Sequence, residues 1–147
     1  MQSSHDELTS VTTPNFSSLE HRTGKVLVIG SEHRMMLPII RSLGRKDLQV
    51  HVAWCPPGNI TLRSRYIHKT HPIPAFADGD DAWLLALQKL LKSQTFDLVI
   101  PATEEAVFPM HQTREVWEKY PSVWLLNDKA FKFAFNKVKI YDLATSL

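Results

Sequence analysis

The chain has 147 residues, of which 44% are hydrophobic, and carries a net charge of +2 with histidine neutral. This length is enough for one globular domain with a buried core. The small net charge and the lack of a basic tract argue against nucleic acid or an anionic membrane as a partner. The single cysteine excludes an internal disulfide and favours a reducing compartment, so we expect a cytoplasmic location.

The N-terminal segment, residues 1–23, is rich in serine and threonine and has no apolar stretch of the kind found in signal peptides. We expect this segment to be flexible. No apolar run approaches the roughly 18 residues that a membrane-spanning helix needs. The sequence therefore divides into a flexible segment over 1–23, one α/β domain over 24–127 and a terminal helix over 128–147.

The first half of the domain shows strand and helix patterns in turn. A β-branched run closed by Gly30 predicts a buried parallel strand over Lys25–Ile29. Apolar residues at i, i+3, i+4 and i+7 then predict a helix over 36–43. Two further strands are expected, over 48–55 and 66–70.

The second half continues the alternation. Apolar residues at helical spacing predict a helix over 83–91, and two more helices are expected over 103–120 and 128–147. Strands are expected over 96–102 and 122–127. This order of elements predicts an α/β fold, with a Rossmann-like, mostly parallel sheet of about five strands and helices on both faces.

In such sheets, ligands bind at the carboxyl ends of the strands, so the loops after the first, second and fourth strands are the candidate sites. The first loop has one glycine, Gly30, where a dinucleotide-binding fingerprint has three, and the second strand ends at Trp54-Cys55 instead of an acid. These departures argue against an NAD site. Ser31 and the N–H groups of the following helix could hold an anion, or Gly30 simply makes the turn.

Thr103, Glu104 and Glu105 follow the fourth strand. A substrate amine or hydroxyl could contact them, or the acids could be ordinary helix-start residues that suit the helix dipole. A phospho-acceptor receiver domain shares this architecture but needs an acidic pair after its first strand and an Asp ending its third. Only Glu32 stands in the first loop, which argues against a receiver domain.

The seven histidines are scattered along the chain, and there is a single cysteine. His68 and His71 form the only close histidine pair, and their odd separation in an extended segment predicts that they point to opposite faces. We therefore expect no metal site. Cys55 has no partner cysteine and is interpreted as a structural residue.

The expected terminal helix has two apolar stripes, one through Phe131 and Val138 and the other through Phe133 and Ile140. One stripe is expected to pack on the sheet. The other predicts an interface, unless both are buried within the domain or in a homodimer. Lys137 lies on the second stripe, where it either extends its amine to solvent or binds an anionic ligand.

Four segments in this order resemble the domain that precedes the ATP-grasp fold in carboxylate–amine ligases, such as carbamoyl-phosphate synthase and biotin carboxylase. The segments are KVLVIGSE, SRYIHKTHPIP, DLVIPATEE and NDKAFKFAFNKVKIYDLATSL. The resemblance covers about residues 25–147. In those families the last helix continues through a leucine and Gly-Ile-Pro into the ATP-binding domain. We therefore expect this chain, which stops at Leu147, to be the front piece of a larger enzyme.

The resemblance implies an enzyme that activates a carboxylate as an acyl phosphate with ATP and Mg²⁺, after which an amine or similar nucleophile displaces the phosphate. ATP and Mg²⁺ would be held mostly by a missing C-terminal ATP-grasp domain or a separate subunit, the expected partner. The family's terminal helix carries an Asp-Lys pair whose lysine contacts ATP phosphate. Asn136-Lys137 matches that pair, apart from Asn in place of Asp, and so implies that Lys137 binds ATP.

By the same resemblance, this chain would supply one wall of the site for a small-molecule acceptor and would be inactive alone. We expect no catalytic residue and no metal ligand on it. The expected substrate-binding residues are Gly30, Ser31, Glu32, Thr103, Glu104 and Glu105. The alternative is a non-catalytic, Rossmann-like binding or protein-interaction module that docks a partner through its last helix.

Overall fold

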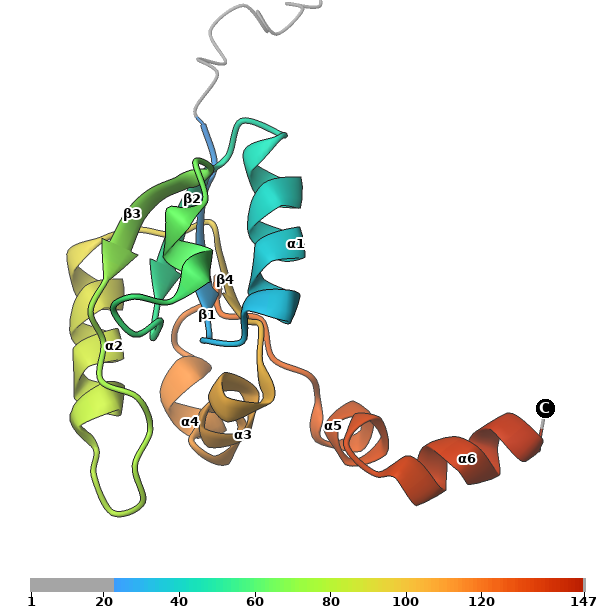
Figure 1. Ribbon diagram of the computed structural model, residues 1–147. Coiled ribbons are helices and arrows are strands. Elements are labelled where there is room, and N and C mark those ends of the chain that lie inside the picture. Colours follow the sequence, from blue (N-terminus) through green and yellow to red (C-terminus); the bar gives the residue numbers. More distant parts are fainter. Residues whose placement is uncertain (1–22, 147) are drawn as a thin grey trace, which may run out of the picture.

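The structure is a computed structural model and describes residues 23–146, so nearly all of the segment 1–23 and also Leu147 lie outside the described residues. Its centre is a parallel sheet of four strands in the order β3-β2-β1-β4 (Figure 1). The α/β fold expected from the sequence is confirmed. The strands are β1 (Lys25–Ile29), β2 (Gln49–Ala53), β3 (Ile67–His71) and β4 (Leu98–Pro101).

The expected fifth strand over 122–127 is reduced to a single bridge. Val123 pairs in parallel with Val99 of β4, and two backbone hydrogen bonds attach the segment there, from Val99 N to Ser122 O and from Trp124 N to Val99 O. Beyond these bonds the chain leaves the sheet to reach the N-cap of the next helix at Asn127. The prediction of a full strand was therefore wrong in extent.

Helices cover both faces of the sheet, as predicted. Strand residues alternate between the faces: Leu27 and Ile29 of β1 face α2 (Ala82–Ser93), α3 (Glu104–Gln112) and α4 (Arg114–Trp117), whereas Val26 and Val28 face α1 (His33–Gly44). Buried strand residues thus contribute to two hydrophobic cores, one on each face of the sheet. Because the strands are held from both faces, the loops at their carboxyl ends start from fixed positions.

Two of the predicted helices are interrupted. The segment 103–120 breaks at Thr113, whose φ of −105° and ψ of 28° leave the helical region and separate α3 from α4. The terminal segment breaks at Asn136, separating α5 (Asp128–Ala134) from α6 (Lys137–Thr145). There the Asn136 side chain accepts a hydrogen bond from Lys139 N at 3.1 Å and starts a new helix.

Helices α5 and α6 extend away from the sheet (Figure 1). The Phe131 ring of α5 stacks on His111 of α3 with centroids 3.6 Å apart, and Arg114 pairs with Asp128 at 2.5 Å. Neither helix buries any residue, and Val138 and Tyr141 of α6 are 68% and 69% exposed. The predicted packing of one stripe on the sheet was therefore wrong, because α5 packs on α3 and α6 packs on neither face.

None of the helices within residues 23–146 combines the length and apolar character that crossing a membrane requires.

Candidate functional site

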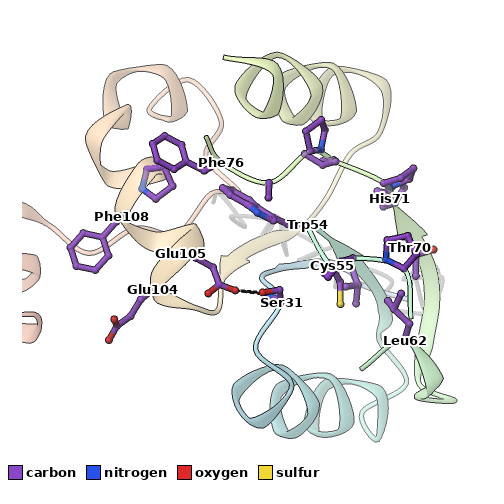
Figure 2. Close-up of a pocket in the computed structure, with 18 of the residues that line it drawn as sticks. Ser31, Trp54, Cys55, Leu62, Thr70, His71, Phe76, Glu104, Glu105 and Phe108 are labelled. Atoms are coloured by element: carbon purple, nitrogen blue, oxygen red, sulfur yellow. Dashed lines mark hydrogen bonds between the residues drawn. The ribbon is translucent and has the colours of Figure 1, made fainter. Parts of the chain in front are cut away.

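A cavity of about 970 Å³ opens at the carboxyl edge of the sheet (Figure 2). Its walls come from the loop after β1, the loops after β2 and β3, and residues along the whole length of α3. This is the edge at which open parallel sheets bind ligands. The lining residues are Ser31, Val52, Trp54, Cys55, Pro56, Pro57, Leu62, Thr70, His71, Pro72, Ile73, Pro74, Ala75, Phe76, Asp78, Glu104, Glu105, Phe108, Pro109 and Gln112.

Gly30 lets the loops after β1 and β4 approach each other closely. Its φ is 153°, and an added Cβ would lie 2.6 Å from both Cγ2 and Oγ1 of Thr103. No side chain fits at that distance unless the backbone moves. The pair therefore sets the spacing at which Ser31 and Glu105, one and two residues further on, can meet.

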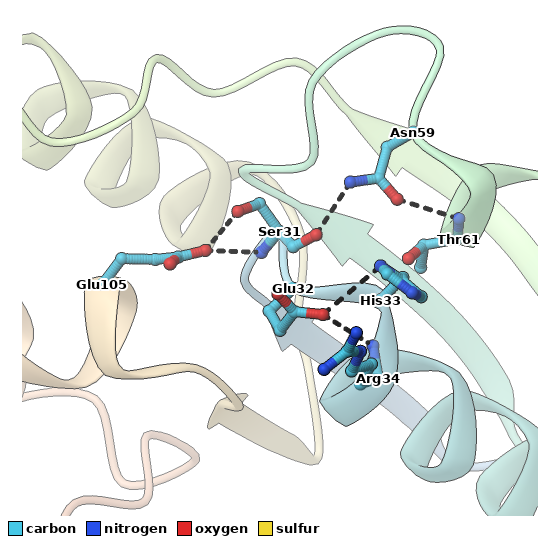
Figure 3. A network of polar contacts seen from close by, with 7 residues as sticks. All are labelled: Ser31, Glu32, His33, Arg34, Asn59, Thr61 and Glu105. Atoms are coloured by element: carbon cyan, nitrogen blue, oxygen red, sulfur yellow. Dashed lines mark hydrogen bonds and ion pairs between the residues drawn. The ribbon is translucent and has the colours of Figure 1, made fainter.

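A chain of hydrogen bonds then joins three segments at the base of the cavity (Figure 3). The Glu105 carboxylate accepts from both the backbone N–H and the hydroxyl of Ser31. Asn59 Nδ2 donates to Ser31 O at 2.7 Å, and Asn59 Oδ1 accepts from Thr61 N at 2.9 Å. The loop after β2 is therefore tied, through Ser31, to the first turn of α3.

The start of α1 is already supplied with negative charge. The Glu32 side chain caps the helix by accepting from Arg34 N at 3.0 Å, and its carboxylate lies 3.3 Å from His33 Nδ1. Glu105 takes the Ser31 N–H in the same region. Two carboxylates in these positions repel a further anion, which disfavours the anion site considered for this loop.

The structure brings together half of the residues that the sequence predicted for substrate binding. Ser31, Glu104 and Glu105 line the cavity, whereas Gly30, Glu32 and Thr103 do not. Gly30 and Thr103 are buried against each other, and Glu32 caps α1.

Lys137 lies apart from the cavity. It is the first residue of α6, its side chain is exposed, and it does not line the cavity.

The charged side chains that line the cavity are acidic. They are Asp78, Glu104 and Glu105, and the described lining includes neither lysine nor arginine. The rest of the wall is mostly apolar, with the aromatic rings of Trp54, Phe76 and Phe108. Such a lining matches a ligand that has an apolar body and a positively charged group.

The apolar wall was not found by reading the sequence. Trp54 has a φ of 69°, a left-handed conformation that is costly for a bulky residue, and its ring packs on Trp83 with centroids 5.4 Å apart. The ring of Phe76 meets Trp83 edge-on at 6.0 Å. The density of prolines in the loops after β2 and β3 was the available signal, because prolines give preformed loop walls.

Three histidines meet beside the cavity, which contradicts the predicted separation of His68 and His71. Both rings stack on His51 of β2, with centroids 5.4 Å and 5.1 Å away. The reason is a register shift between Val50 and His51, which leaves His68 without a partner residue in β2 and changes the alternation of β3. These three rings are not placed to hold a metal ion together, and no other group of three His, Cys, Asp or Glu side chains among residues 23–146 could do so.

Cys55 lines the cavity, and burial raises the pKa of its thiol. The neutral thiol is a poor nucleophile. The interpretation of Cys55 as a structural residue is consistent with this environment.

Comparison with known proteins reveals a shared fold. No family model matches the sequence, and no curated protein sequence matches it significantly. The structure resembles the crystal structure of an L-amino acid ligase from Bacillus licheniformis, with a TM-score of 0.55 and 15% sequence identity. The similarity covers 85% of this chain and 30% of the ligase chain, so this chain spans less than a third of that enzyme. At this identity the likeness shows the fold alone.

Proposed function

We propose that this chain is the substrate-side domain of an ATP-grasp ligase and that its cavity holds the amine-bearing acceptor substrate. The fold shared with part of an L-amino acid ligase supports the relation to ligases. The acidic lining of the cavity carries the choice of an amine, because Glu104 and Glu105 offer carboxylates and the described lining residues include no lysine or arginine.

ATP and Mg²⁺ do not fit the cavity. Phosphates would meet Asp78, Glu104 and Glu105 without any lysine or arginine among the described lining residues. No cluster of three metal-ligating side chains is available within residues 23–146 either. In this proposal both are held by an ATP-grasp domain or subunit outside this chain, and the exposed Lys137 on α6 adds a contact to an ATP phosphate.

The amine assignment is testable by calorimetry with 2-phenylethylamine and 2-phenylethanol, which share an aromatic body and differ in charge at pH 7.5. The amine should bind more tightly. Glu105→Gln keeps an acceptor oxygen for Ser31 but removes the charge, so it should weaken amine binding roughly fivefold, or about 1 kcal/mol for a partly exposed ion pair.

Glu104→Gln should act in the same direction. The matched control is Glu118→Gln, at the C-cap of α4 and outside the cavity lining. Equal binding of the amine and the alcohol would contradict the proposal. So would amine binding that is unchanged in both glutamine variants.

The ATP contact requires a second measurement. We expect ATP with Mg²⁺ to bind to a protein that combines this chain with an ATP-grasp domain, and Lys137→Ala to weaken that binding. Equally tight ATP binding by this chain alone would show that the transfer of the phosphate contact is wrong.

A second candidate function is a non-catalytic interaction module. It is favoured by the exposed apolar side chains of α6, among them Ile140, Tyr141 and Leu143. A protein that binds neither amine nor ATP but associates through α6 would support this alternative.

A further inference from the structure

His51 and His71 form a buried pair at the end of the cavity that is built by β3. His71 is the last residue of β3 and lines the cavity, and its Nε2 lies 2.8 Å from Nδ1 of His51. The two rings are nearly parallel, at 13°. One of these two nitrogens must carry the shared proton, and that choice fixes the hydrogen-bonding character of both rings.

Both histidines are neutral at pH 7. Burial, together with repulsion from His71 and Lys25, lowers the pKa of His51 to about 4. Burial and the neighbouring charges of Lys69 and Lys25 also lower the pKa of His71. The groups that face His51 are thus Lys25 from β1, His68, Lys69 and His71 from β3, and the uncharged ring of Phe96, which precedes β4.

The position of the shared proton follows from the buried side of His51. Its Nε2 is buried and has no hydrogen-bond partner among the described residues. An N–H in that place would be an orphaned buried donor, which proteins avoid more strictly than a buried acceptor without a partner. The proton of His51 therefore belongs on Nδ1, from which it is donated to Nε2 of His71.

A neutral His71 that accepts at Nε2 must carry its own proton on Nδ1. That nitrogen has no partner within the part of the chain that the structure describes, and the residue lines the cavity. We propose that His51 is a positioning residue that holds His71 as a neutral Nδ1–H donor, and that His71 selects cavity ligands with an oxygen acceptor, such as an amide carbonyl.

The selectivity part of this inference rests on the proposed function, because it places the acceptor oxygen on the same ligand whose amine meets Glu104 and Glu105. One end of the cavity would then bind the amine of the ligand, and the other end would bind its acceptor oxygen. The tautomer part rests on the structure alone and is tested without any ligand.

The tautomers are measured on the full chain by two-bond ¹⁵N–¹H correlation NMR from pH 7 to 8. We expect His51 and His71 to remain neutral with the proton on Nδ1, while the exposed His33 serves as an internal reference. His51→Phe keeps a stacking ring but removes the donor, so His71 should move to the Nε2–H form. His68→Phe removes a stacked ring without touching the hydrogen bond and should leave His71 unchanged.

Wild-type His71 found as the Nε2–H form, or as an imidazolium in this pH range, would overturn the assignment. So would His71 that stays in the Nδ1–H form in His51→Phe.

The selectivity is measured by calorimetry with 2-phenylethylamine and L-phenylalaninamide, which adds a carboxamide to the same amine and ring. The amide should bind at least fivefold more tightly to the wild-type protein. His71→Phe should abolish this advantage, and His71→Gln, which retains an N–H donor, should restore part of it. An advantage that persists in His71→Phe overturns the role of His71, whereas a failure of both amines to bind overturns the cavity ligand itself.

Discussion

The buried His51 should make the stability of this fold sensitive to mild acid. The folded-state pKa of His51 is about 4, below the ordinary value of 6.5 expected in the unfolded chain. Between these values the unfolded state binds a proton that the folded state does not accept. The contribution is therefore fully present above pH 6.5 and is lost as the pH falls toward 4.

The size of the effect follows from the shift. A lowering from 6.5 to about 4 corresponds to about 3 kcal/mol, of which about 2 kcal/mol or more should be lost between pH 7.5 and 4.5. Little discount for solvent is needed, because His51 is only 2% exposed. The pKa of His71 is lowered too, which adds to the loss in the same direction.

The assay is urea unfolding of the wild-type protein and of His51→Phe at pH 7.5, 6.0 and 4.5, with constant m-values as a check on two-state behaviour. The variant lacks the titrating group, so its stability should fall by about 2 kcal/mol less across this range. His33→Phe alters an exposed histidine and should follow the wild-type curve. Parallel curves for the wild type and His51→Phe would refute the reasoning.

Two further predictions concern the frame of the site. Gly30→Ala should lower the free energy of unfolding by about 2 to 3 kcal/mol, because its Cβ would lie 2.6 Å from Thr103. In the control Gly58→Ala the added Cβ meets no atom within 4 Å, so this change should cost only the roughly 1 to 2 kcal/mol of a left-handed backbone. Equal losses for the two variants in urea unfolding would contradict this account. Phe131→Ala should reduce amide-exchange protection in α5 at least tenfold while β1 stays protected, because the stack of Phe131 on His111 holds α5 against α3. Unchanged exchange in α5 would show that other contacts are enough to hold it there.

Most of the sheet was readable from the sequence because β1, β2 and β4 are short, largely buried runs, whereas β3 is mostly exposed. Lys25–Ile29 is apolar and β-branched, and its four residues after Lys25 are all buried. The segment 122–127 has a similar composition but forms only one bridge, at Val123. Composition predicts that a segment suits a pleated surface, whereas the chain's exit toward Asn127 decides how much of it pairs.

Interruptions of regular structure account for the other errors. Asn136 is the N-cap of α6, and the new helix that it starts interrupts the predicted one. Asn127 caps the start of α5 in the same way, by accepting from Ala130 N at 2.8 Å. A periodic pattern of apolar residues does not predict such a break, although an asparagine within the pattern does indicate a possible N-cap. In β3, one unmatched residue at His68 was enough to reverse the parity on which the histidine prediction depended.

The candidate site likewise has a part that could be predicted from the sequence and a part that could not. Ser31 and Glu105 were identifiable because the ends of neighbouring parallel strands must lie side by side, whatever the loops do. The apolar wall depends on backbone conformations that only the folded loops reveal, such as the positive φ of Trp54. Position in a regular sheet is thus fixed by short-range patterns, whereas the shape of a loop wall is a tertiary property.

Two features of the chain lack a complement within the described residues, and they differ in kind. The lining of the cavity is acidic, so its missing complement is a cation. Its walls are already formed by proline-rich loops, so a small ligand is enough to fill it. Helix α6 is exposed on every side and includes Lys137 and Lys139 among its apolar residues, so what it lacks is a large surface. A small molecule can satisfy the first, whereas the second requires a macromolecular surface.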